Sequence, residues 1–183
     1  MRSHHVPQPA VERMVPFAGH PAVVGIVPGQ PALVALAALD WARAVGAPAL
    51  HFAYADVSRY VVEEFPDGRI RHAGMDPDAA DDTWRHVEHD LRAHLVRILG
   101  DADVPWELHY LAGRPDRALT HLARAVDAAV LIVGTHAPGP TRRVHELLEG
   151  SVAAHLARHQ HRPVLTVPLS VVDWKATPSA WDR

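Results

Sequence analysis

The chain has 183 residues, of which 48% are hydrophobic and 21% are charged, and its net charge is −3 at pH 7. This length favours one globular domain, and the weak net charge gives no electrostatic reason to expect binding to nucleic acid or to an acidic membrane surface. The sequence contains no cysteine, which excludes disulfides, thiolate catalysis and cysteine-ligated zinc.

The N-terminal residues 1–20 show little hydrophobic periodicity and lack the apolar core of a secretory signal. We therefore expect a mobile leader there. No apolar run in the sequence is long enough to span a bilayer, so we expect no membrane segment and a cytoplasmic location. We assign 21–169 to one α/β domain and 170–183 to a C-terminal tail.

From residue 22 onward, short apolar strands alternate with helical patterns. We expect strands at 22–27, 50–55, 106–111, 129–133 and 164–167, and helices at 32–45, 83–99, 113–126 and 151–159. Such alternation predicts a parallel sheet with helices on both faces. Ligands of these sheets bind at the carboxyl ends of strands, where the strand order reverses.

One insertion interrupts the alternation at about 60–72. Two short strand patterns flank the turn sequence Pro66-Asp67-Gly68, which predicts a β-hairpin. We expect this hairpin to project from the body of the sheet, where a partner subunit could touch it.

The stretch 129–156 contains the strongest candidate for an anion site. A buried strand ends at Gly134, a loop follows, and Gly150-Ser151-Val152 opens a helix. Unpaired N–H groups and the dipole at a helix start favour a phosphate, and a glycine lets that phosphate approach the backbone. The same residues also fit a plain turn followed by an N-cap serine, and the residues alone leave both interpretations open.

This stretch also carries a family resemblance. Gly134-Thr135-His136, the later Gly150-Ser151-Val152, the helix after it and the segment 161–168 resemble the C-terminal half of a universal stress protein domain. The resemblance extends back to about Ala22. It implies one open, parallel five-stranded sheet of order 3-2-1-4-5 and a homodimer formed through the edge strand Val164–Val167.

The resemblance further implies a stress-response regulatory protein that binds an adenine nucleotide, ATP, without fast turnover. It implies Mg²⁺ only as a companion of the nucleotide. The first loop would hold the adenine and ribose, and the later loop would hold the phosphates. The nucleotide-binding residues implied in this way are Val27, Pro28, Gly29, Ala55, Gly134, Thr135, His136, Gly139, Gly150, Ser151 and Val152.

The sequence departs from the family pattern at several of these positions. Pro28 stands where the family has an aspartate, Ala137 replaces the second glycine, and the loop before Gly150 is longer. These departures keep a second hypothesis open, a dimeric interaction module whose pocket no longer binds nucleotide. An enzyme of the nucleotidyl-transferase kind is a third hypothesis. The absence of a histidine pair in the first strand–helix turn argues against it.

We predict no catalytic residue and no metal site. Glu63 and Glu64 are adjacent in a strand and so point to opposite faces. Ser151 lacks the flanking glycines of a nucleophile elbow. His155 and His159 have a spacing at which two imidazoles can share a metal ion. Without a His-Glu-x-x-His pattern we interpret them as a histidine-rich helix face.

Overall fold

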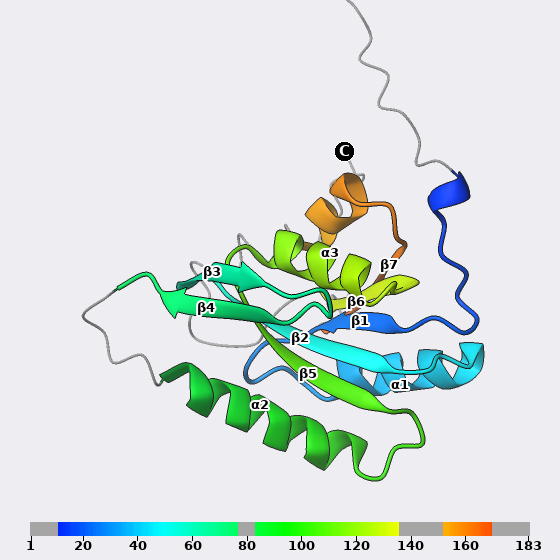
Figure 1. Cartoon of the computed structure of the whole chain (residues 1–183). Coiled ribbons are helices and arrows are strands. Elements are labelled where there is room, and N and C mark those ends of the chain that lie inside the picture. The colour runs from blue at the N-terminus through cyan, green and yellow to red at the C-terminus, as the bar shows by residue number, and fades with distance from the viewer. Residues whose placement is uncertain (1–10, 77–82, 136–151, 170–183) are drawn as a thin grey trace, which may run out of the picture.

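A five-stranded parallel sheet forms the centre of the protein in the computed structural model, which describes residues 11–76, 83–135 and 152–169. Its strand order is β5-β2-β1-β6-β7 (Figure 1), which confirms the predicted 3-2-1-4-5 arrangement. The strands are β1 (Ala22–Gly25), β2 (Leu50–Asp56), β5 (Trp106–Ala112), β6 (Val130–Gly134) and β7 (Val164–Val167).

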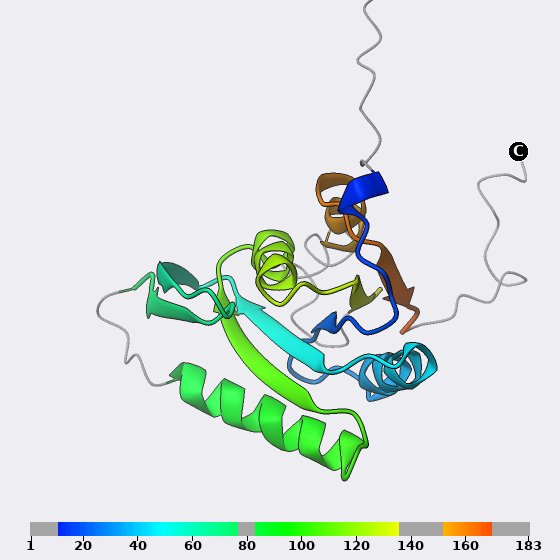
Figure 2. The ribbon, with the colours of Figure 1, turned by 45° about the vertical axis from the view of Figure 1, so that its right-hand side comes forward.

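Helices cover both faces of this sheet, as the sequence predicts. The helices α1 (Leu33–Val45) and α2 (Thr83–Leu99) lie on one face. The helix α3 (Pro115–Ala125) and the helical segment 152–159 lie on the other (Figure 2), and a short 3-10 helix, Val11–Arg13, precedes the first strand. No helix within the described ranges is long and apolar enough to cross a membrane.

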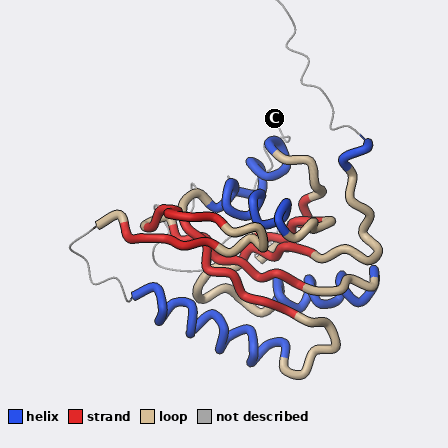
Figure 3. Tube along the Cα trace, viewed as in Figure 1, coloured by secondary structure: helices blue, strands red, loops and turns tan. Residues whose placement is uncertain are grey.

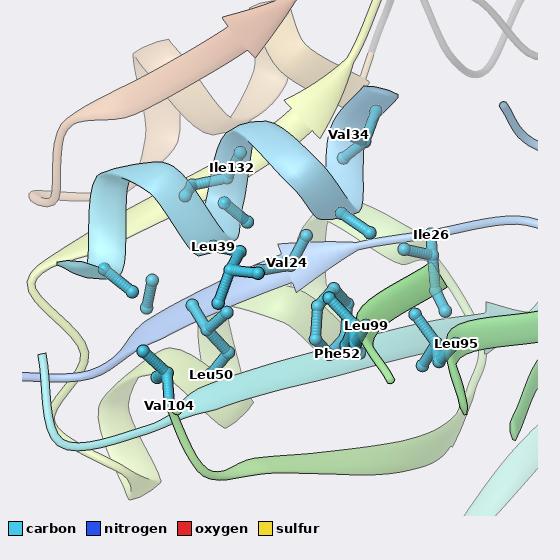
Figure 4. Packing of buried hydrophobic residues seen from close by; sticks show 14 of the residues in the cluster. Val24, Ile26, Val34, Leu39, Leu50, Phe52, Leu95, Leu99, Val104 and Ile132 are labelled. Carbon is cyan, nitrogen blue, oxygen red and sulfur yellow. The ribbon is translucent and has the colours of Figure 1, made fainter. Parts of the chain in front are cut away.

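Side chains alternate between two apolar cores because successive residues of a strand point to opposite faces. Val24 of β1 packs with Phe52 of β2 in the core under α1 and α2 (Figure 4), whereas Val23 packs with Leu122 in the core under α3. All four are completely buried. Burying one such side chain contributes about 1.5–3 kcal/mol, so both cores hold the strand ends firmly in place.

The first strand is shorter than we predicted. It ends at Gly25 rather than at Val27, although the N–H of Ile26 still donates to the carbonyl of Ala53 at 2.9 Å. Pro28 has no N–H to continue the ladder, and Gly29 takes a left-handed backbone with φ of 75°. The chain therefore turns away from the sheet here and enters α1.

The predicted β-hairpin is present as β3 (Arg59–Glu64) and β4 (Ile70–Gly74). It does not project from the sheet, so that expectation is wrong. The two hairpin strands, drawn red in Figure 3, contact the edge strand β5. The turn residue Gly68 is buried against Leu122 and Ala125 of α3. An uncovered edge strand offers unpaired backbone groups, and the hairpin shields that edge of the sheet.

Candidate functional site

The carboxyl ends of β1 and β6 lie side by side at the point where the strand order reverses. The two strands pair in parallel, with Gly25 opposite Val133. After β1 the chain passes to α1 on one face, while α3, which leads into β6, lies on the other. A crevice between oppositely directed connections is where open α/β sheets bind their ligands.

A small hollow occupies this crevice. Its volume is about 70 Å³, and its lining is mostly apolar. The lining residues are Gly25, Ile26, Val27, Gln30, Ala53, Tyr54, Ala55, Val57, Pro115, Leu119, Val133, Gly134 and Val152. Ligand pockets typically measure about 300–1,000 Å³. The hollow is therefore smaller than a typical ligand pocket, and a ligand of that size would extend beyond it.

Four of the residues that the sequence singled out meet in the hollow although they come from distant parts of the chain. Val27 follows β1, Ala55 belongs to β2, Gly134 ends β6, and Val152 begins the helical segment 152–159. The parallel sheet brings them together at one edge, so their proximity follows from its topology.

The other predicted site residues fall outside the hollow. Pro28 and Gly29 form an exposed turn beside it. Thr135 makes two hydrogen bonds to the C-terminal end of the described chain. Its N–H donates to the carbonyl of Val167 at 3.0 Å, and its hydroxyl accepts from the N–H of Leu169 at 3.2 Å. His136, Gly139, Gly150 and Ser151 lie outside the described residues.

Two glycines that line the hollow, Gly25 and Gly134, are packed closely against neighbouring side chains. A Cβ added at Gly25 would lie 3.0 Å from Val133 and 3.1 Å from Leu119. One added at Gly134 would lie 2.7 Å from Leu169 and 2.8 Å from the Nε2 of Gln30. The side chains of Val133 and Leu119 occupy the space beside Gly25, so only glycine fits at this position. The space above Gly134 is already filled by two side chains.

Several lining residues were missed by the sequence analysis, notably Gly25, Gln30 and Val57. Gly25 carries a signal, since a glycine inside a β-branched run marks a close approach of another group to the backbone. Val57 follows a strand end, and Gln30 precedes a helix. The carboxyl ends of β1 and β2, with the turn that follows β1, contain all three.

Asp56, the residue after Ala55 of the hollow, is held by hydrogen bonds. Asp56 accepts from the N–H and the hydroxyl of Ser58 at 2.9 and 2.6 Å and from the hydroxyl of Tyr110 at 2.6 Å. Burial opposes ionisation of Asp56, but these hydrogen bonds and the charge of Arg59 outweigh it and lower its pKa. Burial and, to a smaller extent, the charge of Asp56 raise the pKa of Tyr54 to about 12. The Tyr54 side chain that lines the hollow is therefore a neutral phenol at pH 7.

A wider cleft of about 750 Å³ lies between α3, the hairpin and the segment 152–159. Some of its charged groups pair with each other: Arg114 lies 2.8 Å from Asp116, and His121 lies 3.0 Å from Glu64. Besides these elements the carboxyl end of β5 lines the cleft, and no residue of β1 or β6, the strands at the switch point, lines it. We therefore take the smaller hollow as the candidate site.

Comparison with known proteins agrees with this description of the fold. The sequence model of the Universal stress protein family matches residues 23–168. The chain belongs to the universal stress protein family. The comparison with curated proteins returned no match.

Solved structures of universal stress proteins share the fold at low sequence identity. UspA from Lactobacillus plantarum is 16% identical, with a TM-score of 0.58 over 82% of this chain and 98% of its own. The Archaeoglobus fulgidus protein in complex with dAMP is 19% identical, with a TM-score of 0.52 over 80% and 96%. A universal stress protein in complex with cAMP is 24% identical, with a TM-score of 0.51 over 84% and 99%.

Proposed function

We propose that this universal stress protein binds an adenine nucleotide, ATP, at the carboxyl ends of β1 and β6 and acts as a regulatory protein without rapid turnover. The observation that carries the proposal is the apolar hollow at the switch point. A purine ring is flat and largely apolar, and the backbone of Gly25 and the side chains of Ala55 and Val133 offer it a matching surface.

Related structures support the choice of nucleotide. Two universal stress proteins of the same fold were solved with dAMP and with cAMP, both adenine nucleotides. The phosphates would extend toward Gly134 and Val152, which flank the segment 136–151 in the sequence. N–H groups at the start of the helix that contains Val152 would bind them. Mg²⁺ would accompany the phosphates rather than bind the protein alone.

Mass spectrometry of small molecules released from the denatured, purified protein tests this proposal. We expect an adenine nucleotide at a substantial fraction of one per chain. If none is released, and millimolar ATP or AMP does not raise the melting temperature, the proposal fails. A GTP arm serves as the control for general phosphate binding, because it keeps the triphosphate and changes only the base.

One observation favours a second candidate function. Leu169 and Gln30 fill the space above Gly134, and Pro28 removes an N–H from the first loop. A chain with this arrangement could instead be a dimeric interaction module whose pocket no longer binds nucleotide. Under that alternative, neither ATP nor AMP binds, while the dimer and its surface persist.

We also propose that two copies pair through β7 in the cytoplasm. In the described part of the chain β7 is an edge of the main sheet, with β6 on its other side, and Leu165 is 40% exposed there. Unpaired backbone groups on an apolar edge strand favour pairing with a second strand. A second β7 in the partner would satisfy them.

A further inference from the structure

Two histidines and a glutamate meet on the sheet away from the nucleotide hollow. Parallel pairing places His51 of β2 beside Glu107 of β5, and alternation along β5 puts His109 on the same face as Glu107. His51 Nδ1 lies 3.0 Å from His109 Nε2. Glu107 Oε2 lies 3.8 Å from the first of these nitrogens and 3.6 Å from the second.

We propose that His51, Glu107 and His109 bind one divalent first-row transition-metal ion, with Zn²⁺ as the probe. Three atoms separated by 3.0, 3.6 and 3.8 Å share a centre about 2.0 Å from each, which is the length of Zn–N and Zn–O bonds. Two imidazoles with one carboxylate suit zinc, iron or nickel and disfavour Mg²⁺ and Ca²⁺, which prefer oxygen ligands alone.

The surroundings of the three side chains suit a metal ion. The side chains of His109 and His51 are only 6% and 13% exposed, so their rings are held by packing, while that of Glu107 is 69% exposed. The ion can enter past Glu107, and the open side leaves room for water ligands. A neutral imidazole ring has one nitrogen lone pair that it can offer to a metal ion.

Within the described residues, His51, Glu107 and His109 are the one group of three histidine, aspartate or glutamate side chains whose ligating atoms all lie within 4.8 Å of one another. The sequence pattern that best resembled a metal site was the helical pair His155 and His159. Their rings are stacked at 5.2 Å, and a nitrogen of His159 lies 3.0 Å from the carbonyl oxygen of His155. The residues of the cluster come from two strands, with Glu107 and His109 two apart on β5 and His51 on β2, so no local spacing in the sequence indicates the group.

Calorimetric titration of Zn²⁺ into the chelator-treated full chain, without nucleotide, tests the proposal independently of ATP. The variants are Glu107→Gln, which alters an exposed side chain, and His51→Gln. The control is the double variant His155→Ala/His159→Ala, which removes two histidines from a helix. A control is essential because the chain has 15 histidines, some of which will bind Zn²⁺ weakly.

We expect one tight Zn²⁺ per wild-type chain, on the order of tenfold or more weaker binding for each of the first two variants, and unchanged binding for the control. Imidazole nitrogen resonances of His51 and His109 should shift on addition of Zn²⁺. The proposal is overturned if wild type shows no tight site, if Glu107→Gln binds as wild type does, or if only the control loses binding. If His51→Gln does not fold, the Zn²⁺ affinity of Glu107→Gln still tests the proposal, because Glu107 is exposed.

Discussion

The hydroxyl of Tyr110 donates a 2.6 Å hydrogen bond to Oδ2 of Asp56, which joins β5 to the end of β2. The other carboxylate oxygen accepts from the N–H and the hydroxyl of Ser58. Both oxygens of Asp56 are thus bonded where the chain leaves the sheet for the hairpin. This carboxylate anchors the hairpin and stands one residue from Ala55, which lines the candidate site.

Replacing Tyr110 by phenylalanine should therefore lower the free energy of unfolding by about 1.5–3 kcal/mol, the contribution of a hydrogen bond to a charged group. Urea denaturation measures this. Tyr60→Phe is the matched control, because Tyr60 is 49% exposed. We expect it to change stability by less than about 0.5 kcal/mol. Equal effects of the two changes would show that the bond to Asp56 contributes nothing.

Stability should fall at alkaline pH partly because of Tyr54. Its pKa is raised to about 12 by burial and, to a smaller extent, by the charge of Asp56. The phenol of the unfolded chain loses its proton near pH 10, before that of the folded chain. The stability contributed by Tyr54 is therefore fully present below about pH 10 and is lost as the pH rises toward 12.

Tyr54→Phe should flatten this decline, whereas Tyr60→Phe should leave it unchanged. Part of the decline will remain, because burial and the bond to Asp56 also raise the pKa of Tyr110. Denaturation curves collected across this range measure the slope. An unaltered slope in Tyr54→Phe would contradict the assignment.

Gly68→Ala should loosen the hairpin. Gly68 has φ of 84°, and an added Cβ would lie 2.5 Å from Leu122 Cδ1. Gly46 is a matched control, since it has φ of 65° with no atom within 4 Å of an added Cβ. Both substitutions incur the cost of a left-handed alanine, about 1–2 kcal/mol. Gly68→Ala should cost more, by about 1–3 kcal/mol, because of the clash. Similar losses in urea would mean that the turn does not pack on α3.

Leu165→Lys should separate the proposed dimer. The substitution puts a charge on the exposed edge of β7, where strand pairing would bury it. Val96→Lys is the control, because Val96 is 53% exposed on α2. Light scattering after size exclusion should show a dimer for wild type and for the control, and a folded monomer for Leu165→Lys. A wild-type monomer at micromolar concentration would overturn the dimer proposal.

The arrangement of the main sheet could be predicted from the sequence because its strands are short, apolar and separated by helical patterns. The helix at 83–99 and the strand at 164–167 have the bounds we predicted, since hydrophobic periodicity defines both clearly. Gly46 ends α1 with φ of 65°, as its position after the last apolar residue predicts. The sheet order itself came from the family resemblance.

The packing of the hairpin and the histidine cluster could not be predicted in the same way. The turn 66–68 fixes a hairpin locally, but its docking on Leu122 depends on a residue far along the chain. Likewise, His51 meets His109 only through the register of β2 with β5. Contacts between distant segments leave no local periodicity in the sequence, so both features needed the three-dimensional arrangement.

Calorimetric titration of ATP into wild type, Val57→Glu and Val62→Glu tests the central claim most directly. Val57 lines the hollow and is 38% exposed, whereas Val62 is 45% exposed on the hairpin and does not line it. A carboxylate in the apolar hollow should lose its hydration when the adenine ring binds, which should cost about 1 kcal/mol or more. We predict that wild type and Val62→Glu bind ATP equally well and that Val57→Glu binds it at least several-fold more weakly. Failure of wild type to bind ATP, or equal binding by all three proteins, would contradict a nucleotide site at these strand ends.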